Sequence, residues 1–140
     1  MENSRLPQSP DARAVAERIV GCLLSHKAVA VTLFSVADVT TVTEYYVNAT
    51  GRSSTQVRSL CDDVTDALAE EGIRPLHVEG RDGGAWLLAD YGYVIVNIFD
   101  RESRAFYDLD RRFPPECKCD ISGIVAEVDR KFGAVTPENG

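Results

Sequence analysis

Apolar residues recur at the three- and four-residue spacing of an amphipathic helix in three stretches of the chain. The first begins after Ser9, a good N-cap residue, and ends near His26. The second covers residues 57–68 and is the most regular. The third covers residues 121–132, with Asp120 as its expected N-cap. The pattern therefore predicts three helices.

Shorter stretches rich in β-branched and aromatic residues are typical of strands. They are residues 28–36, 42–49, 75–79, 85–90 and 93–99. The order of helix, two strands, helix and three strands predicts an α+β domain in which helices flank a mixed β-sheet. A short helical or turn-like piece is expected after the last strand, before the polar end of the chain.

The composition narrows the class of protein. With 140 residues and a mass of 15.4 kDa, the chain has the size of one domain. Its 15 Lys and Arg residues against 22 Asp and Glu residues give a formal charge of -7 and a pI near 4.8. An acidic protein does not hold nucleic-acid phosphates by charge alone, so this argues against sequence-independent nucleic-acid binding.

The sequence also bears on the cellular compartment. Its four cysteines lack the spacing of a secreted disulfide framework, and no apolar run approaches the roughly 20 residues of a bilayer span. Residues 1–10 have neither the apolar core of a secretory signal nor the pattern of a transit peptide. We therefore expect a cytoplasmic protein without membrane contact.

Residues that could support catalysis are few. The two histidines, His26 at a helix end and His77 on a short strand, are interpreted as structural. Cys117 and Cys119 resemble half of a metal site, but no second Cys or His pair completes it. We expect no metal and no cofactor.

The turn at residues 50–54 leads from a strand into a helix, as phosphate-binding turns do. It lacks the Lys and the glycine spacing of a P-loop, and we favour helix capping as its role. A nucleotidyltransferase would also need two acids one residue apart on the next strand to hold magnesium, and that strand offers Glu79 alone. Trp86, the single tryptophan, is compatible with either a core position or an interface.

A series of motifs then resembles the ribosomal silencing factor family, also called Iojap-like. The motifs are Glu44-Tyr-Tyr-Val-Asn-Ala-Thr-Gly51, Ser53 to Gln56-Val57, Val78-Glu79-Gly80, Trp86, Asp90-Tyr-Gly92, Val94-Ile-Val96 and Arg104-Ala-Phe-Tyr-Asp-Leu109. They stand in the order of the family and at nearly its spacing. The resemblance implies a fold related to that of nucleotidyltransferases but without their catalytic acids.

The resemblance also implies a function without catalysis. Family members bind the large ribosomal subunit at its intersubunit face, on the fourteenth large-subunit protein, and block joining of the small subunit. Little direct RNA contact is expected, since an acidic protein is attracted to a basic ribosomal protein and repelled by RNA. The alternatives left open are a nucleotide-binding or nucleotidyl-transferring enzyme on a related fold and a homodimeric regulatory module.

Carried over to this chain, the resemblance implies a set of partner-binding residues on the last two strands and the piece after them. They are Trp86, Asp90, Asn97, Phe99, Arg104, Tyr107 and Leu109. We assign the four apolar residues to anchoring and the Asp and Arg residues to polar pairing.

The chain departs from the family pattern at four positions. Glu44 replaces an Asp, Asn48 an apolar residue, Tyr93 an Asp and Asn97 a His. The family-like domain is expected to cover residues 1–113. Residues 114–140 form a C-terminal extension with a short helix.

Overall fold

The computed structural model describes residues 11–133 of the chain. The predicted cap Ser9 lies outside this range, and Asp11 is the N-cap of the first helix, α1 (Ala12–Ser25). The Asp11 carboxylate accepts hydrogen bonds from the backbone N–H groups of Arg13 and Ala14, at 3.1 and 3.4 Å. The helix ends at the predicted place, with His26 as its C-cap.

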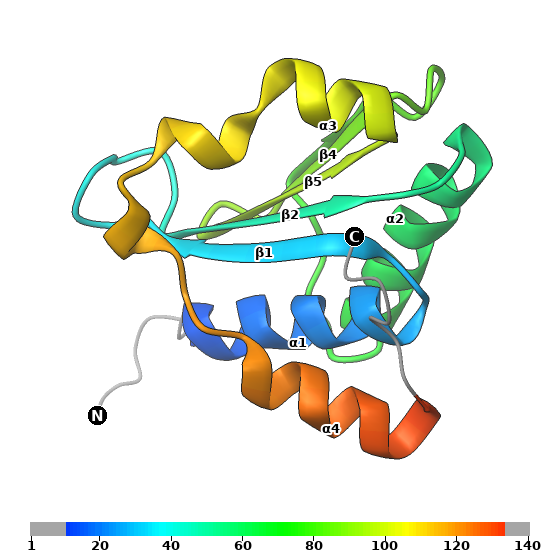
Figure 1. The fold of residues 1–140 in the computed structure, drawn as a ribbon, viewed down its shortest axis with the longest axis horizontal. Helices are drawn as coiled ribbons and strands as arrows, with labels where there is room; N and C mark the ends of the chain where they lie inside the picture. The colour runs from blue at the N-terminus through cyan, green and yellow to red at the C-terminus, as the bar shows by residue number, and fades with distance from the viewer. Residues whose placement is uncertain (1–10, 134–140) are drawn as a thin grey trace.

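Five strands form one sheet, as the sequence predicts (Figure 1). They are β1 (Val29–Ser35), β2 (Tyr45–Thr50), β3 (His77–Glu79), β4 (Trp86–Asp90) and β5 (Val94–Phe99). The strand order is β1-β2-β5-β4-β3, with β2 and β5 parallel and all other neighbours antiparallel. The sheet is therefore mixed, and α2 (Ser54–Ala69) lies in the connection that follows β2.

Helices cover both faces of the sheet. Figure 1 shows α1 on one side and α3 (Arg101–Tyr107) on the other, with α4 (Ser122–Phe132) beyond α1. Alternate residues of β5, namely Val94, Val96 and Ile98, join the apolar core with α1 and α2. The remaining β5 side chains, which point to the face under α3, are buried too. Both faces of this strand are thus protected from water.

The segment after α3 crosses the edge of the sheet before it reaches α4. Two short 3-10 turns, η1 (Leu109–Arg112) and η2 (Pro115–Cys117), lead to a single bridge between Lys118 and Phe34 of β1. The predicted N-cap of α4 needs correction, because Ile121 holds that position. Asp120 lies one residue earlier and accepts a hydrogen bond from the backbone N–H of Ser122 at 2.9 Å, which lowers the pKa of its carboxyl.

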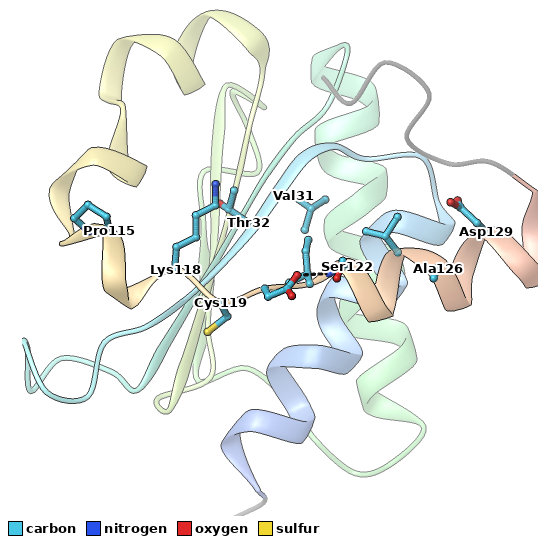
Figure 2. Close-up of a pocket in the computed structure, with 11 residues that line it drawn as sticks. Val31, Thr32, Pro115, Lys118, Cys119, Ser122, Ala126 and Asp129 are labelled. Carbon is cyan, nitrogen blue, oxygen red and sulfur yellow. Dashed lines mark hydrogen bonds between the residues drawn. The ribbon is translucent and has the colours of Figure 1, made fainter.

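A groove of about 740 Å³ separates β1 from α4 on this side of the molecule (Figure 2). Val31 and Thr32 of β1 line one wall, and Ala126 and Asp129 of α4 line the other. Lys118 and Cys119 lie at the end where the chain passes from the sheet to α4. None of the seven predicted partner-binding residues lines this groove.

Candidate functional site

The sheet face under α3 carries two rows of side chains that the strand register places side by side. One row runs from Thr50 through Phe99 to Trp86, on β2, β5 and β4. The next row runs from Thr32 of β1 through Asn48 and Asn97 to Leu88. Four strands therefore contribute to one continuous surface, although the residues are far apart in sequence.

Aromatic rings dominate the first row. The half-buried Trp86 ring lies on the Phe99 ring, with centroids 5.1 Å apart, and against the Tyr107 ring of α3, at 4.5 Å. Phe106 meets Tyr107 edge to face at 5.0 Å. Tyr107 is 40% exposed and Phe106 is 78% exposed. We call Trp86, Phe106 and Tyr107 the aromatic patch. It presents large apolar rings on a firm base, as interface hot spots do.

A hollow of about 200 Å³ adjoins the aromatic patch. It is lined by Glu79, Gly80, Trp86 and Leu88, where β3 and β4 approach each other. Gly80 has φ +88°, and a Cβ there would collide with the backbone carbonyl oxygen of Trp86. Only glycine fits this position, and it keeps the turn close to Trp86. The hollow thus has an apolar wall and one acidic side chain.

The second row is polar and runs beneath the patch. The indole Nε1–H of Trp86 donates to Asn97 Oδ1 at 2.9 Å. Asn97 Nδ2 donates to Asn48 Oδ1 at 3.1 Å, and Asn48 Nδ2 donates to Asp110 Oδ1 at 2.9 Å. We call these three hydrogen bonds the polar relay. It links the surface tryptophan to a carboxylate on η1.

Asp110 joins the polar relay to α3. Its Oδ2 accepts from the Thr32 hydroxyl at 2.9 Å and from the Arg104 guanidinium at 3.0 Å. Arg104 also donates to the hydroxyl of Thr50 at 2.9 Å. Asp108 makes this arrangement possible, since its left-handed backbone, at φ 49° and ψ 48°, ends α3 and turns the chain back over the sheet.

The structure brings most of the predicted site residues together. Trp86, Phe99 and Tyr107 share one aromatic cluster, and Asn97 contacts Trp86 directly. Arg104 reaches the same network through Asp110. Phe99 and Asn97 are buried, so their place is beneath the surface. Which of these residues touch a partner stays a prediction.

Two predicted residues are placed differently. Asp90 lies at the opposite end of β4 from Trp86, and its carboxylate accepts from the backbone N–H of Gly92 at 2.7 Å. It therefore closes the β4–β5 turn and is not brought to the aromatic patch. Leu109 is partly buried at the start of η1, next to the residue that holds Arg104.

Sequence reasoning missed three members of this site. Phe106 stands inside a recognised motif, and two adjacent aromatic residues on one helix cannot both face the sheet, which was a usable signal. Asn48 was noted only as a departure from an apolar residue. Asp110 had no signal, because its role depends on a contact with residues more than 60 positions earlier.

The turn after β2 acts as a helix cap, as predicted. Ser53 is the N-cap of α2, and its hydroxyl accepts from the backbone N–H of Gln56 at 3.1 Å. Gln56 Oε1 in turn accepts from the backbone N–H of Arg52 at 2.6 Å. A Cβ on Gly51 would lie 2.9 Å from a methyl group of Val57, so this turn is also tightly packed. These contacts use the backbone N–H groups of Arg52 and Gln56 within the turn and the helix start.

Cys22, His26 and Asp63 lie together as in some catalytic sites, but their surroundings do not activate the thiol. Cys22 Sγ lies 3.8 Å from His26 Nδ1, and His26 Nε2 lies 3.9 Å from Asp63. However, burial and, as a smaller effect, the charge of Asp63 together raise the pKa of the Cys22 thiol to about 11. The thiol is therefore protonated near neutral pH and is a poor nucleophile. His77 is exposed and pairs with Glu79 at 3.0 Å.

Within residues 11–133 the structure contains no group of three or more His, Cys, Asp or Glu side chains that could hold a metal ion. In the same range, no helix is both long and apolar enough to cross a membrane.

Comparison with known proteins identifies the family. A family model described as "Ribosomal silencing factor during starvation" matches residues 9–137, which is nearly the whole chain. The chain belongs to the ribosomal silencing factor family. This confirms the resemblance seen in the sequence motifs.

Individual relatives agree with this assignment. The ribosomal silencing factor RsfS of Halalkalibacterium halodurans is 24% identical over 71% of this chain and 86% of its own length. The RsfS protein of Haemophilus influenzae is 28% identical over 70% of this chain and 96% of its own. A crystal structure of a protein from Chromobacterium violaceum matches with a TM-score of 0.71 at 25% identity, covering 73% of this chain and 85% of that one.

Proposed function

We propose that this chain is a ribosomal silencing factor that binds the large ribosomal subunit at its intersubunit face and blocks joining of the small subunit. The observation that carries the proposal is the aromatic patch, in which Phe106 and Tyr107 expose large rings beside Trp86. Exposed aromatic rings are the usual anchors of a protein-protein interface. The family assignment supports a partner on the ribosome.

The charge of the chain supports a protein partner on the ribosome. With a formal charge of -7, the chain is repelled by RNA phosphates and attracted to a basic ribosomal protein. The fourteenth large-subunit protein, implied by the family resemblance, is therefore the proposed docking site, with little direct RNA contact. Glu79 places one acidic group beside the patch.

The proposed action is steric and involves no turnover. A bound domain of 15.4 kDa occupies the volume that the small subunit needs, and its negative charge repels the phosphates of that subunit. The thiol of Cys22 is not activated, and the turn at residues 50–54 serves as a helix cap. No observation in the described part of the chain favours the nucleotide-dependent alternative.

The experiment is co-sedimentation of the purified chain with isolated large and small ribosomal subunits, followed by a subunit-joining assay at raised magnesium. We expect binding to large subunits only and fewer joined ribosomes. Trp86→Ala and Phe106→Ala should each weaken binding by about tenfold or more, since they remove anchors of the patch.

Phe132→Ala is the matched control. Phe132 is also a strongly exposed phenylalanine, 58% exposed, but it lies on α4 on the other side of the molecule. Its removal should leave binding unchanged. Binding of the wild-type chain to neither subunit would reject the proposal, and so would equal losses for Phe106→Ala and Phe132→Ala.

A further inference from the structure

The two ends of the polar relay can form hydrogen bonds in only one sense. The indole N–H of Trp86 can only donate, and the carboxylate of Asp110 can only accept. Each amide between them, at Asn97 and Asn48, can do both. All three distances, 2.9, 3.1 and 2.9 Å, are satisfied when both amides turn their oxygens toward Trp86 and their NH2 groups toward Asp110. The polar relay therefore has a direction.

The middle of the polar relay is sealed from water. Asn48 is 0% exposed and Asn97 is 1% exposed. A buried amide that loses its partner is costly, so each member constrains the next. The two buried amides, at Asn48 and Asn97, bond directly to each other. They are thus physically coupled.

The far end of the polar relay holds α3 in place. No residue of α3 is buried, so apolar packing alone anchors this helix weakly. Arg104 ties α3 to Asp110 and to Thr50, and Tyr107 rests against Trp86. The relay therefore connects to the aromatic patch twice, once through the Trp86 indole and once through α3.

We propose that the polar relay fixes the Trp86 ring and α3 relative to each other, which makes Asn48 and Asp110 positioning residues of the docking surface. Neither residue belongs to the aromatic patch, and Asn48 cannot touch a partner because it is fully buried. The effect on docking rests on the proposed function. The effect on Trp86 does not.

An exchange of the two groups tests the direction of the relay. Asn48→Asp sets a second carboxylate against Asp110 and removes the donor between them. Asp110→Asn keeps the size of the side chain but leaves one oxygen instead of two, so it cannot accept from both Asn48 and Arg104 as the carboxylate does. In the double variant the amide at position 110 can donate to the carboxylate at position 48, which still accepts from Asn97. The double variant should therefore recover part of what the single variants lose.

Two measurements compare the wild-type chain, Asn48→Asp, Asp110→Asn and the double variant. Trp86 is the only tryptophan of the chain, so acrylamide quenching of intrinsic fluorescence reports on this one ring. Affinity for isolated large ribosomal subunits reports on docking. We expect each single variant to raise quenching and to weaken binding by about tenfold, and the double variant to lie closer to wild type than Asp110→Asn does.

Val96→Ala controls for general loosening. Val96 is buried in β5 next to Asn97, but it faces the core on the other side of the sheet. It should lower the melting temperature while quenching and affinity stay at their wild-type values. If it reproduces the effects of the single variants, the relay has no special role and the proposal is rejected.

The remaining outcomes also decide the matter. If Asn48→Asp fails to fold, Asp110→Asn can still be compared with the double variant. The proposal then requires that adding Asn48→Asp to Asp110→Asn brings both the quenching and the affinity closer to their wild-type values. A double variant no better than Asp110→Asn overturns the proposal. If the wild-type chain does not bind large subunits, the proposed function fails, while the quenching results still accept or reject the relay.

Discussion

Lys27 has a backbone conformation that glycine would adopt at lower cost. It follows the C-cap of α1 with φ 73°, and its N–H and that of Ala28 bond to the carbonyl oxygens of Leu24 and Leu23, at 3.0 and 2.9 Å. This is the Schellman pattern, whose left-handed residue is usually glycine. We expect Lys27→Gly to raise the free energy of unfolding by about 1 kcal/mol in urea denaturation, with an unchanged m-value.

Gly72 is the residue at which the opposite substitution can be tested. It follows α2 with φ +80°, and the N–H of Ile73 bonds back to Leu68 at 3.0 Å. Gly72→Ala should lower the free energy of unfolding by about 1 kcal/mol, since alanine must then adopt the left-handed conformation. If the two substitutions changed stability in the same direction, backbone conformation would not be the cause.

Buried thiols should make the fold sensitive to alkali. Burial raises the pKa of Cys61 to about 11, whereas an unfolded chain releases this proton near the ordinary thiol pKa of 9.0. Between these values the folded state holds more protons than the unfolded state, so stability is full below about pH 9 and falls as pH rises toward 11. Cys22 behaves in the same way.

Replacing one thiol isolates its part of this effect. The slope of the unfolding free energy against pH measures how many protons the chain releases on unfolding. For Cys61→Ala we expect this number, between about pH 9 and 11, to be smaller by about one than in the wild-type chain. Denaturant titrations at a series of pH values measure this slope. Equal slopes in the two proteins would show that the Cys61 thiol titrates alike in the folded and unfolded states.

At the scale of the elements, α3 differs from the other α-helices of residues 11–133 in how it is held. It has no buried residue, and its N-cap Asp100 accepts from the backbone N–H of Ser103 at 2.8 Å. Asp100→Ala should cost about 1 kcal/mol at this helix end. Because the aromatic patch uses α3, we expect faster amide hydrogen exchange in residues 101–107 and weaker binding to large subunits.

Asp11→Ala tests whether the effect is local. Asp11 is the N-cap of α1, on the other side of the sheet, and its loss should be of similar size. Amide exchange in α3 should then stay as in the wild-type chain. Faster exchange in α3 after Asp11→Ala would mean that α3 opens together with the whole domain.

Periodicity predicted the elements because each is a local pattern. The stripe from Val57 to Leu68 lies within α2, and the strands predicted at residues 85–90 and 93–99 are present as β4 and β5. The ends were less accurate. The strand predicted from Val42 starts at Tyr45, because Val42 is 63% exposed in the loop before the strand, where its apolar character has no structural consequence.

The site was only partly predictable, for a physical reason. The family motifs put Trp86 and Tyr107 in one predicted set of residues, and in the structure their ring centroids lie 4.5 Å apart. The relay joins Asn48 on β2 to Asp110 on η1, two segments that lie 62 positions apart in sequence and meet only in the folded structure. The spacing of residues in the sequence does not indicate such a contact.

At the scale of the whole molecule, the net charge should control the rate of docking. An acidic chain that meets a basic ribosomal protein associates faster at low salt, and added salt screens this attraction. We therefore expect the association rate to fall by about tenfold or more from low to physiological ionic strength, and the dissociation rate to change much less. Stopped-flow measurements with labelled protein and isolated large subunits give both rates.

Charge near the patch should matter more than charge elsewhere. Glu79 lines the hollow beside Trp86, whereas the exposed Glu70 lies at the end of α2. Glu79→Gln and Glu70→Gln change the net charge equally, so a difference between them reflects position alone. We expect Glu79→Gln to slow association about twofold to threefold and Glu70→Gln to have little effect. Two results would contradict docking on a basic protein: faster association after either substitution, or an association rate that rises with salt. Either result would mean that the surface facing this protein is negatively charged, as RNA is.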